Sequence, residues 1–150
     1  MKKLRTLTFV AATLALTSAA YAQSDDTVQT RFGTIAVVSD PGQSKITLNG
    51  KALTYPKTPD YGVIDDASSL AFGKKFSIGE SEVILVQENS GGTGCPMTYS
   101  FVTVSSKGAT ITKPVADDHC SDIYKVSQNG NKIVLKVGKK SFTYNNADIH

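Results

Sequence analysis

Residues 123–137 read Ile-Tyr-Lys-Val-Ser-Gln-Asn-Gly-Asn-Lys-Ile-Val-Leu-Lys-Val, and this stretch decides the fold class. Apolar and polar side chains alternate on both sides of Asn129-Gly130, a dipeptide typical of two-residue hairpin turns. A turn centred there pairs Val126 with Ile133 and Tyr124 with Leu135. The stretch therefore predicts two antiparallel strands with one face toward a core. That core face holds Tyr124, Val126, Ile133, Leu135 and Val137, and the opposite face holds Lys125, Lys132 and Lys136.

A second hairpin is predicted over Lys45–Tyr55, with Asn49-Gly50 at its turn. A two-residue loop at this position pairs Leu48 with Lys51 and Ile46 with Leu53. This register places four apolar side chains on one face of the hairpin: Ile46, Leu48, Leu53 and Tyr55.

The rest of the chain has the same period of two. Val83 to Val86 are four consecutive apolar residues within 82–88, which favours a central strand covered on both faces. Further strands are predicted at 34–38, at 98–105 and 109–112 around a turn at 106–108, and at 141–144. Residues 65–70 permit at most one helical turn, capped by Asp65 or Asp66. Short strands about ten residues apart predict an all-β fold, an antiparallel β-sandwich or a barrel-like sheet built from hairpins.

The first 22 residues have the features of a cleaved signal peptide. Lys2, Lys3 and Arg5 precede a short apolar stretch, and Ala20-Tyr21-Ala22 is a small-x-small cleavage site. We expect export to the periplasm or beyond, and no membrane span after removal of this segment. Residues 23–30 are polar and are predicted to form a flexible arm, which leaves 31–150 as a single β-rich domain.

The charge balance excludes one class of function. The chain has 16 Lys and Arg against 13 Asp and Glu, a formal net charge of +3. The predicted signal peptide contains three of the basic residues and no acidic one, so its removal leaves a formally neutral protein. Strong electrostatic binding to nucleic acid requires a net basic surface, so we expect no nucleic-acid partner, although the neutral balance does not exclude a local basic patch. Residues 121–150 keep a local excess of lysines, which we interpret as protection of a sheet edge.

Cys95 and Cys120 are the two cysteines of the chain. An even number of cysteines in an exported protein predicts a disulfide, and two cysteines allow one intramolecular pairing. Closing a loop of about 25 residues should stabilise the fold by about 3 kcal/mol. A redox or metal-binding pair is the competing interpretation, but the chain contains no Cys-x-x-Cys motif.

Asp117, Asp118 and His119 form the cluster with most potential for metal or catalytic chemistry. A metal site would use Asp117, His119 and the terminal His150. Neighbouring residues of an extended loop point in different directions, so a polar loop is the favoured interpretation. We expect no bound cofactor.

Two enzymatic interpretations have weaker support. A hydrolase triad could combine Ser90 or Ser121 with His119 and Asp117 or Asp118, but no Gly-x-Ser-x-Gly motif marks a nucleophile. Paired carboxylates for glycoside cleavage would come from Asp65, Asp66, Glu80, Glu82 or Glu88. Glu80 and Glu82 are better explained as surface acids on one side of a strand, because such sites need a specific separation.

The glycine-rich segment 90–94 allows a further binding site. Its glycine N–H groups, at Gly91, Gly92 and Gly94, could form an anion-binding nest. The segment lacks the Gly-Lys-Ser/Thr ending of a phosphate loop. A sharp turn that presents Cys95 is the simpler interpretation.

Several motifs between Val83 and Ser127 extend these observations. They are Val83-Ile-Leu-Val-Gln-Glu-Asn-Ser-Gly-Gly-Thr-Gly-Cys-Pro96, Tyr99-Ser-Phe-Val-Thr-Val104, Cys120-Ser-Asp122 and, continuing just beyond, Lys125-Val-Ser-Gln-Asn-Gly-Asn-Lys132. In these motifs the chain resembles a family of small exported proteobacterial proteins of unknown function. The resemblance implies export and a Cys95–Cys120 disulfide, and it implies no activity. Asp117-Asp-His119 departs from the family pattern, so the resemblance assigns His119 no role.

Together these observations predict a non-enzymatic envelope protein. We expect a rigid, disulfide-bonded β domain that binds a protein or a cell-wall component, in the manner of a small accessory factor or inhibitor. A metal-binding periplasmic protein is the alternative, and a hydrolase has the least support.

Overall fold

The computed structural model describes residues 27–40, 43–54, 69–89, 97–116, 121–145 and 148–149. These residues form strands and turns, and the described part contains no helix. The strands are β1 (Thr27–Thr30), β2 (Gly33–Asp40), β3 (Gln43–Leu48), β4 (Lys51–Ala52), β5 (Ser69–Ile78), β6 (Ser81–Asn89), β7 (Met97–Ser105), β8 (Gly108–Ile111), β9 (Tyr124–Asn129), β10 (Lys132–Val137), β11 (Lys140–Asn145) and β12 (Asp148–Ile149).

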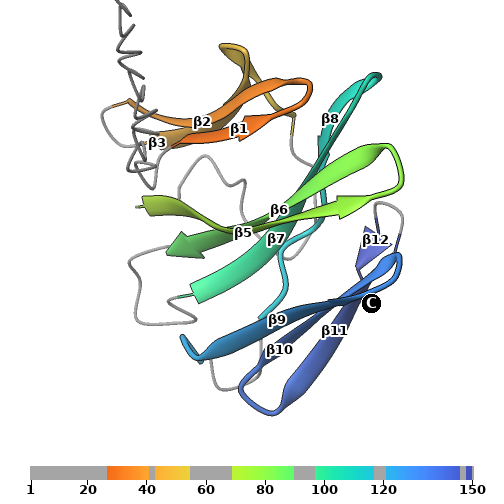
Figure 1. Ribbon diagram of the computed structural model, residues 1–150. Coiled ribbons are helices and arrows are strands. Elements are labelled where there is room, and N and C mark those ends of the chain that lie inside the picture. Colours follow the sequence, from red (N-terminus) through yellow and green to blue (C-terminus); the bar gives the residue numbers. More distant parts are fainter. Residues whose placement is uncertain are drawn as a thin grey trace, which may run out of the picture.

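The described strands form three four-stranded antiparallel sheets, which confirms the all-β prediction. Sheet A has the order β1-β2-β3-β4, sheet B the order β5-β6-β7-β8 and sheet C the order β12-β11-β10-β9. Each sheet is a meander in which sequence neighbours pair. Figure 1 shows the sheets as three layers, with sheet B between the other two.

Two hydrophobic cores join the layers. The first packs Val28, Ile35 and Ile46 of sheet A against Ile84 and other residues of sheet B. The second packs the opposite face of sheet B against sheet C, where Ile133, Leu135 and Val137 are completely buried. Strand β6 contributes to both cores, because Ile84 and Val86 belong to the first and Val83 and Leu85 to the second. The prediction of a central strand covered on both faces is therefore confirmed.

The hairpin at Asn49-Gly50 forms as predicted. Leu48 pairs with Lys51, and the Leu53 N–H donates to the Ile46 carbonyl at 2.9 Å. Asn49 and Gly50 both have positive φ, 50° and 79°, as a type I′ turn requires. The Asn49 side chain also accepts a hydrogen bond from the Thr34 N–H at 2.9 Å, so the turn is fastened to the start of β2.

The predicted register of the β9–β10 hairpin is wrong by two residues. Asn129 pairs with Lys132, so Gly130 and Asn131 are the central turn residues, and Leu135 lies opposite Val126. A shift of two residues keeps every side chain on its face, so the hydrophobic pattern cannot distinguish the two registers. Positive φ falls on Gly130, at 58°, which suits a type II′ turn with glycine at its first central position. The predicted core face is correct.

The predicted N-terminal arm is also partly wrong. Thr27–Thr30 form β1, which pairs with β2, and Val28 is 3% exposed in the first core. A single apolar residue in a polar segment is a weak signal, and pairing with β2 is what places Val28 over sheet B. Residues 23–26 of the arm lie outside the described residues.

Strand β5 was not predicted from the sequence, because a bulge breaks its alternation. Leu70 and Phe72 face sheet A, whereas Phe76 and Ile78 face sheet C. The register against β6 shifts by one residue between Phe72 and Lys75, which exchanges the two faces. Gly73 lies in the bulge, where a Cβ atom would be 3.1 Å from the Leu85 Cδ2.

Several predictions lie outside the described residues. These are the signal peptide, the placement of Tyr55, the cap at Asp65 or Asp66, and the Cys95–Cys120 disulfide. Ser69 and Leu70, the last residues of the suggested helical turn, belong to β5. In the described ranges, no helix is long and apolar enough to cross a membrane.

Candidate functional site

A cleft opens between the edges of sheets A and B, and we call it the β4–β8 cleft. One wall comprises Leu48 and residues 51–54, and the other comprises residues 107–111. Its volume is about 600 Å³. Strands β4 and β8 are terminal in their sheets, so the cleft runs between two sheet edges. Figure 1 shows β8 rising from the middle layer at the end of the molecule that carries sheet A.

The inner part of the cleft is apolar. Ile111 is 8% exposed and belongs to the core between sheets A and B. Leu48, Leu53 and Ala109 are partly buried and pack against the same core. A ligand in the cleft would therefore cover apolar surface that already borders a rigid core.

The backbone of β8 adds hydrogen-bonding groups to this apolar surface. In an antiparallel ladder, alternate residues point their N–H and C=O groups toward the partner strand. The Thr112 N–H donates to the Phe101 carbonyl at 3.0 Å, so Thr110 and Thr112 face β7 across the ladder. Ala109 and Ile111 consequently direct their backbone groups away from β7, toward the open edge. Such an edge can pair with another extended chain.

Two lysines give the cleft a positive charge. Lys51 begins β4 and Lys107 lies in the β7–β8 turn, and both are exposed. Neither forms an ion pair with a described residue. The lining described here contains no acidic side chain. The cleft thus combines an apolar interior, a free strand edge and a cationic mouth.

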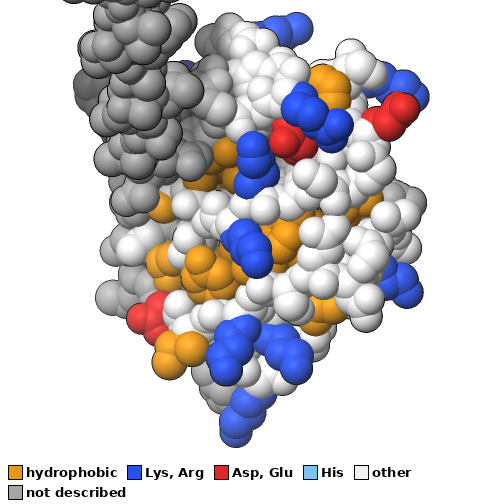
Figure 2. All heavy atoms as spheres, viewed as in Figure 1, with side chains coloured by type: hydrophobic (Ala, Val, Ile, Leu, Met, Phe, Trp, Pro, Cys, Tyr) orange, Lys and Arg blue, Asp and Glu red, His pale blue; other side chains and the backbone are white. Residues whose placement is uncertain are grey.

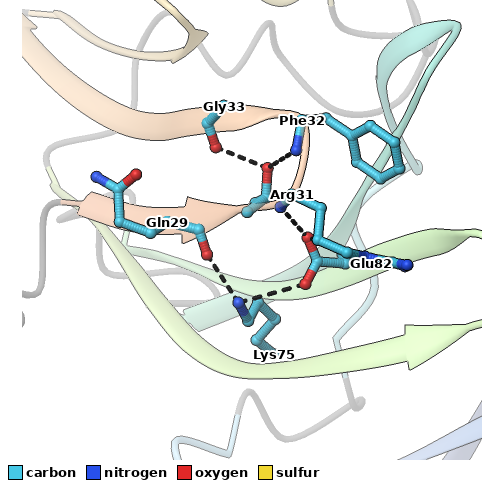
Figure 3. Close-up of polar contacts among 7 residues, drawn as sticks. Gln29, Arg31, Phe32, Gly33, Lys75 and Glu82 are labelled. Atoms are coloured by element: carbon cyan, nitrogen blue, oxygen red, sulfur yellow. Dashed lines mark hydrogen bonds and ion pairs between the residues drawn. The ribbon is translucent and has the colours of Figure 1, made fainter.

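A separate cluster of polar residues connects sheet A to sheet B at the β1–β2 turn (Figure 3). The Glu82 side chain is only 6% exposed, and its Oε2 accepts a hydrogen bond from the Arg31 backbone N–H at 2.5 Å. The Lys75 Nζ lies 3.4 Å from Glu82 Oε1 and donates to the Gln29 carbonyl at 2.7 Å. The bulge in β5 brings Lys75 to the face that meets this carboxylate. The cluster ties the first hairpin to the middle sheet.

These contacts determine the charge state of Glu82. Burial raises the pKa of this carboxyl group, but the Arg31 N–H and the Lys75 ammonium outweigh burial and hold the pKa below its ordinary value of 4.5. A carboxyl whose pKa is lowered by folding stabilises the native state above its ordinary pKa, and this contribution is lost as the pH falls through the folded-state pKa. Glu82 is therefore a structural anion at neutral pH.

Replacing this anion should weaken the fold in a pH-dependent way. We expect Glu82→Gln to lower the free energy of unfolding by about 1–2 kcal/mol at pH 7, since a charged hydrogen-bond acceptor is lost beside two exposed, screened cations. The difference from wild type should shrink as the pH falls below 4.5. Urea unfolding at pH 7 and pH 3 measures both values. Glu80→Gln, in the exposed β5–β6 turn, is the control; a pH-independent difference for Glu82→Gln would contradict this role.

A second acid of β6, Glu88, lies at the opposite end of the strand from Glu82. It is half-buried, and burial raises its pKa, while a 3.3 Å hydrogen bond from the Thr98 hydroxyl partly offsets this effect. Thr98 is its cross-strand partner on β7. Among the described residues Glu88 has this hydroxyl as its contact and no second carboxylate, so it forms no acid pair.

The structure describes few of the residues that the sequence singled out. Asp117, Asp118, His119, His150, Ser90, Asp65, Asp66, Gly91, Gly92 and Gly94 lie outside the described residues, as do Cys95 and Cys120. Ser121 lies within them, and its hydroxyl oxygen accepts a hydrogen bond from the Ile123 N–H at 3.1 Å. The described residues contain no group of three His, Cys, Asp or Glu side chains that could hold a metal ion.

One of the sequence interpretations is wrong. Glu82 is not a surface acid like Glu80, because the β1–β2 turn covers it. The β4–β8 cleft was also not foreseen. The short strands β4 and β8 begin at Lys51 and just after Lys107, and no pattern in the sequence indicated that the edges of these two strands lie beside each other.

Comparison with known proteins adds no assignment. No family model matches the chain, and no curated protein or solved structure is significantly similar to it.

Proposed function

We propose that this protein is an exported, non-enzymatic binding module that holds an extended segment of a partner protein in the β4–β8 cleft. The observation that carries the proposal is the open edge of β8 beside an apolar lining. Addition of a strand to an exposed sheet edge is a common way to recognise peptides, because backbone hydrogen bonds supply affinity and alternate side chains supply specificity. Export rests on the predicted signal peptide.

The lining also supports a particular kind of segment. Every second residue of an added strand would point toward Ile111 and Leu53, and apolar side chains suit those positions. The remaining side chains would lie near the mouth of the cleft, where Lys51 and Lys107 favour acidic residues. We therefore expect an extended segment in which apolar and acidic residues alternate.

The same lining favours holding over chemistry. The cleft offers backbone groups, aliphatic side chains, threonines and ammonium groups. General acid–base catalysis would need a group such as an imidazole or a carboxylate within reach of the reacting atoms. The described lining therefore offers apolar contacts, hydrogen bonds and positive charge, all of which serve binding.

Removal of a single backbone N–H should test the proposed mode. Ala109→Pro deletes the N–H that faces away from β7, and proline is tolerated at such an edge position. Ala109→Ser keeps the N–H and is the matched control. The probe is a fluorescent octapeptide that alternates valine and glutamate. We expect Ala109→Pro to weaken its binding by about ten-fold or more in fluorescence anisotropy, and Ala109→Ser to bind like wild type.

Two outcomes would overturn the proposal. One is equal binding by Ala109→Pro and wild type while the proline variant keeps its β-sheet circular dichroism. The other is tighter binding of an octapeptide that alternates valine and lysine. Pull-down from envelope extract with wild type and Ala109→Pro then separates cleft-dependent partners from other proteins. Light scattering of wild type alone shows whether a second copy of this chain occupies the edge instead.

A further inference from the structure

The outer face of strands β9, β10 and β11 carries positive charge and no negative charge. Lys125 of β9 and Lys132 and Lys136 of β10 are exposed and point away from the core residues Ile133, Leu135 and Val137. Strands β9, β10 and β11 contain no acidic residue. We call these three side chains the lysine face. Figure 2 shows lysine and arginine side chains over the lowest layer, where sheet C lies, as well as over the upper layers.

Two of these lysines lie directly opposite each other. Lys125 is the cross-strand partner of Lys136. Side chains in such a pair start about 5 Å apart, and like charges at this distance destabilise a sheet. The unbound protein therefore bears a repulsion that an anionic ligand would relieve.

Edge protection explains only part of this arrangement. Lysines on an edge strand discourage pairing with other chains, and Lys125 on the edge strand β9 can serve that purpose. Lys132 and Lys136 lie on β10, which is paired on both sides with β9 and β11. A surface whose charges serve solubility mixes positive and negative side chains, whereas the charged residues of β9–β11 are all lysines. The lysine face therefore needs another explanation.

The neighbours of the lysines are small and polar. Ser141 is the partner of Lys136, and Val134 lies between Ser127 and Thr143. The hydroxyl groups can donate and accept hydrogen bonds close to the ammonium groups. Lys132 and Lys136 are about 14 Å apart along β10 at the usual rise of a strand. A surface with hydroxyl groups beside charges that follow one strand suits a linear ligand.

We propose that the lysine face binds an acidic polysaccharide, a linear glycan with carboxylate groups along its chain. Carboxylates would pair with Lys125, Lys132 and Lys136, and sugar hydroxyls would hydrogen-bond to the serine and threonine side chains. A lipid surface is less suited, because the outer positions of β9–β11 offer Val134 as their apolar side chain and it is only half exposed. Single-stranded nucleic acid is less suited too, because these positions carry no aromatic ring for base stacking.

This inference goes beyond the proposed function and does not depend on it. The lysine face belongs to sheet C, whereas the β4–β8 cleft lies between sheets A and B. A peptide in the cleft and a glycan on the outer face of sheet C would not share a contact residue. The protein could therefore hold both at once and connect a partner protein to an acidic polysaccharide.

The experiment compares two triple variants with the same change of net charge. Lys125→Gln/Lys132→Gln/Lys136→Gln removes the lysine face. Lys51→Gln/Lys107→Gln/Lys113→Gln removes three exposed lysines from β4, the β7–β8 turn and the segment after β8. Polygalacturonate is the probe, and its affinity is measured by titration calorimetry at several salt concentrations. We expect the first triple variant to bind at least about ten-fold more weakly than wild type and the second to bind like wild type. Binding by wild type should weaken as salt is added.

Several results would overturn the inference. Equal loss in both triple variants would show attraction by net charge alone. Equal affinity for neutral dextran would exclude recognition of carboxylates, and tighter binding to vesicles containing phosphatidylglycerol or to single-stranded DNA would identify another ligand.

Lys125→Gln alone should leave the melting temperature unchanged or raise it, because it removes the repulsion from Lys136. Valine–glutamate peptide binding should weaken only in the second triple variant, so this test and that of the cleft can fail separately.

Discussion

Leu85→Ala should lower the free energy of unfolding by about 3 kcal/mol or more, and Ile84→Ala should have an effect of similar size. Both side chains are completely buried, Leu85 in the core between sheets B and C and Ile84 in the core between sheets A and B. Each truncation removes apolar contacts and leaves a cavity, because Phe101 opposite Leu85 and Val102 opposite Ile84 are fixed in their own strands. Large losses of stability at two neighbouring positions are expected only for a strand with a sheet packed on each of its faces.

Strand β10 offers the matched control, because it is covered on one face. Leu135→Ala should be as severe as Leu85→Ala, whereas its neighbour Val134→Ala should cost less than about 1 kcal/mol, since Val134 lies half-exposed on the outer face. Urea unfolding followed by circular dichroism measures all four variants. An Ile84→Ala effect as small as that of Val134→Ala would show that sheet A does not cover β6.

Loss of the predicted Cys95–Cys120 disulfide should destabilise the protein by about 3 kcal/mol, a large part of the stability of one domain. Both cysteines lie outside the described residues, but their chain neighbours lie close together. The Tyr99 hydroxyl donates to the Ser121 carbonyl at 3.4 Å, and the rings of Tyr99 and Tyr124 are 5.2 Å apart. The start of β7 and the segment that leads into β9 thus adjoin, which a bridge between the preceding cysteines requires.

We expect Cys95→Ser to lower the melting temperature and to keep its β-sheet circular dichroism, because both cores remain. Cys95→Ser/Cys120→Ser should melt close to the single variant, since either substitution removes the same bond. Thermal melts with and without reductant, together with a thiol assay on protein purified from the periplasm, provide the measurement. Two reactive thiols in that material, or equal melting temperatures with and without reductant, would refute the pairing.

Local sequence patterns were sufficient for much of the fold. The four consecutive apolar residues of β6 indicated a strand covered twice, and Asn49-Gly50 set both the turn and the register of its hairpin. These predictions succeeded because the period of two is a property of the chain itself and Asn49-Gly50 adopts the φ values that Asn-Gly favours. The same dipeptide at 129–130 did not set the register of its hairpin, because Gly130 and Asn131 form that turn. The candidate site was not predicted at all, because its walls are more than fifty residues apart in sequence.

The errors have three different physical origins. A two-residue shift of the β9–β10 register leaves the apolar pattern unchanged, a bulge breaks the alternation of β5, and β1 depends on its cover by sheet B. The sequence does not predict β5, because its bulge at Gly73 breaks the alternation. The bulge fits contacts with β6, since Gly73 lies close to Leu85 and Lys75 reaches Glu82. The sequence predicts an arm in place of β1, because Val28 is a single apolar residue in a polar segment and its burial depends on sheet B.

The amino-acid sequence by itself determined which residues form most strands, which face of each hairpin is apolar and where the Asn49-Gly50 turn lies. The tertiary structure decided that sheets A and C lie on opposite faces of sheet B, that Glu82 is buried against the β1–β2 turn, and that the edges of β4 and β8 border one cleft. The physical reason is that side-chain alternation specifies which face of a strand must be covered, whereas the identity of the cover depends on packing between residues far apart in the chain.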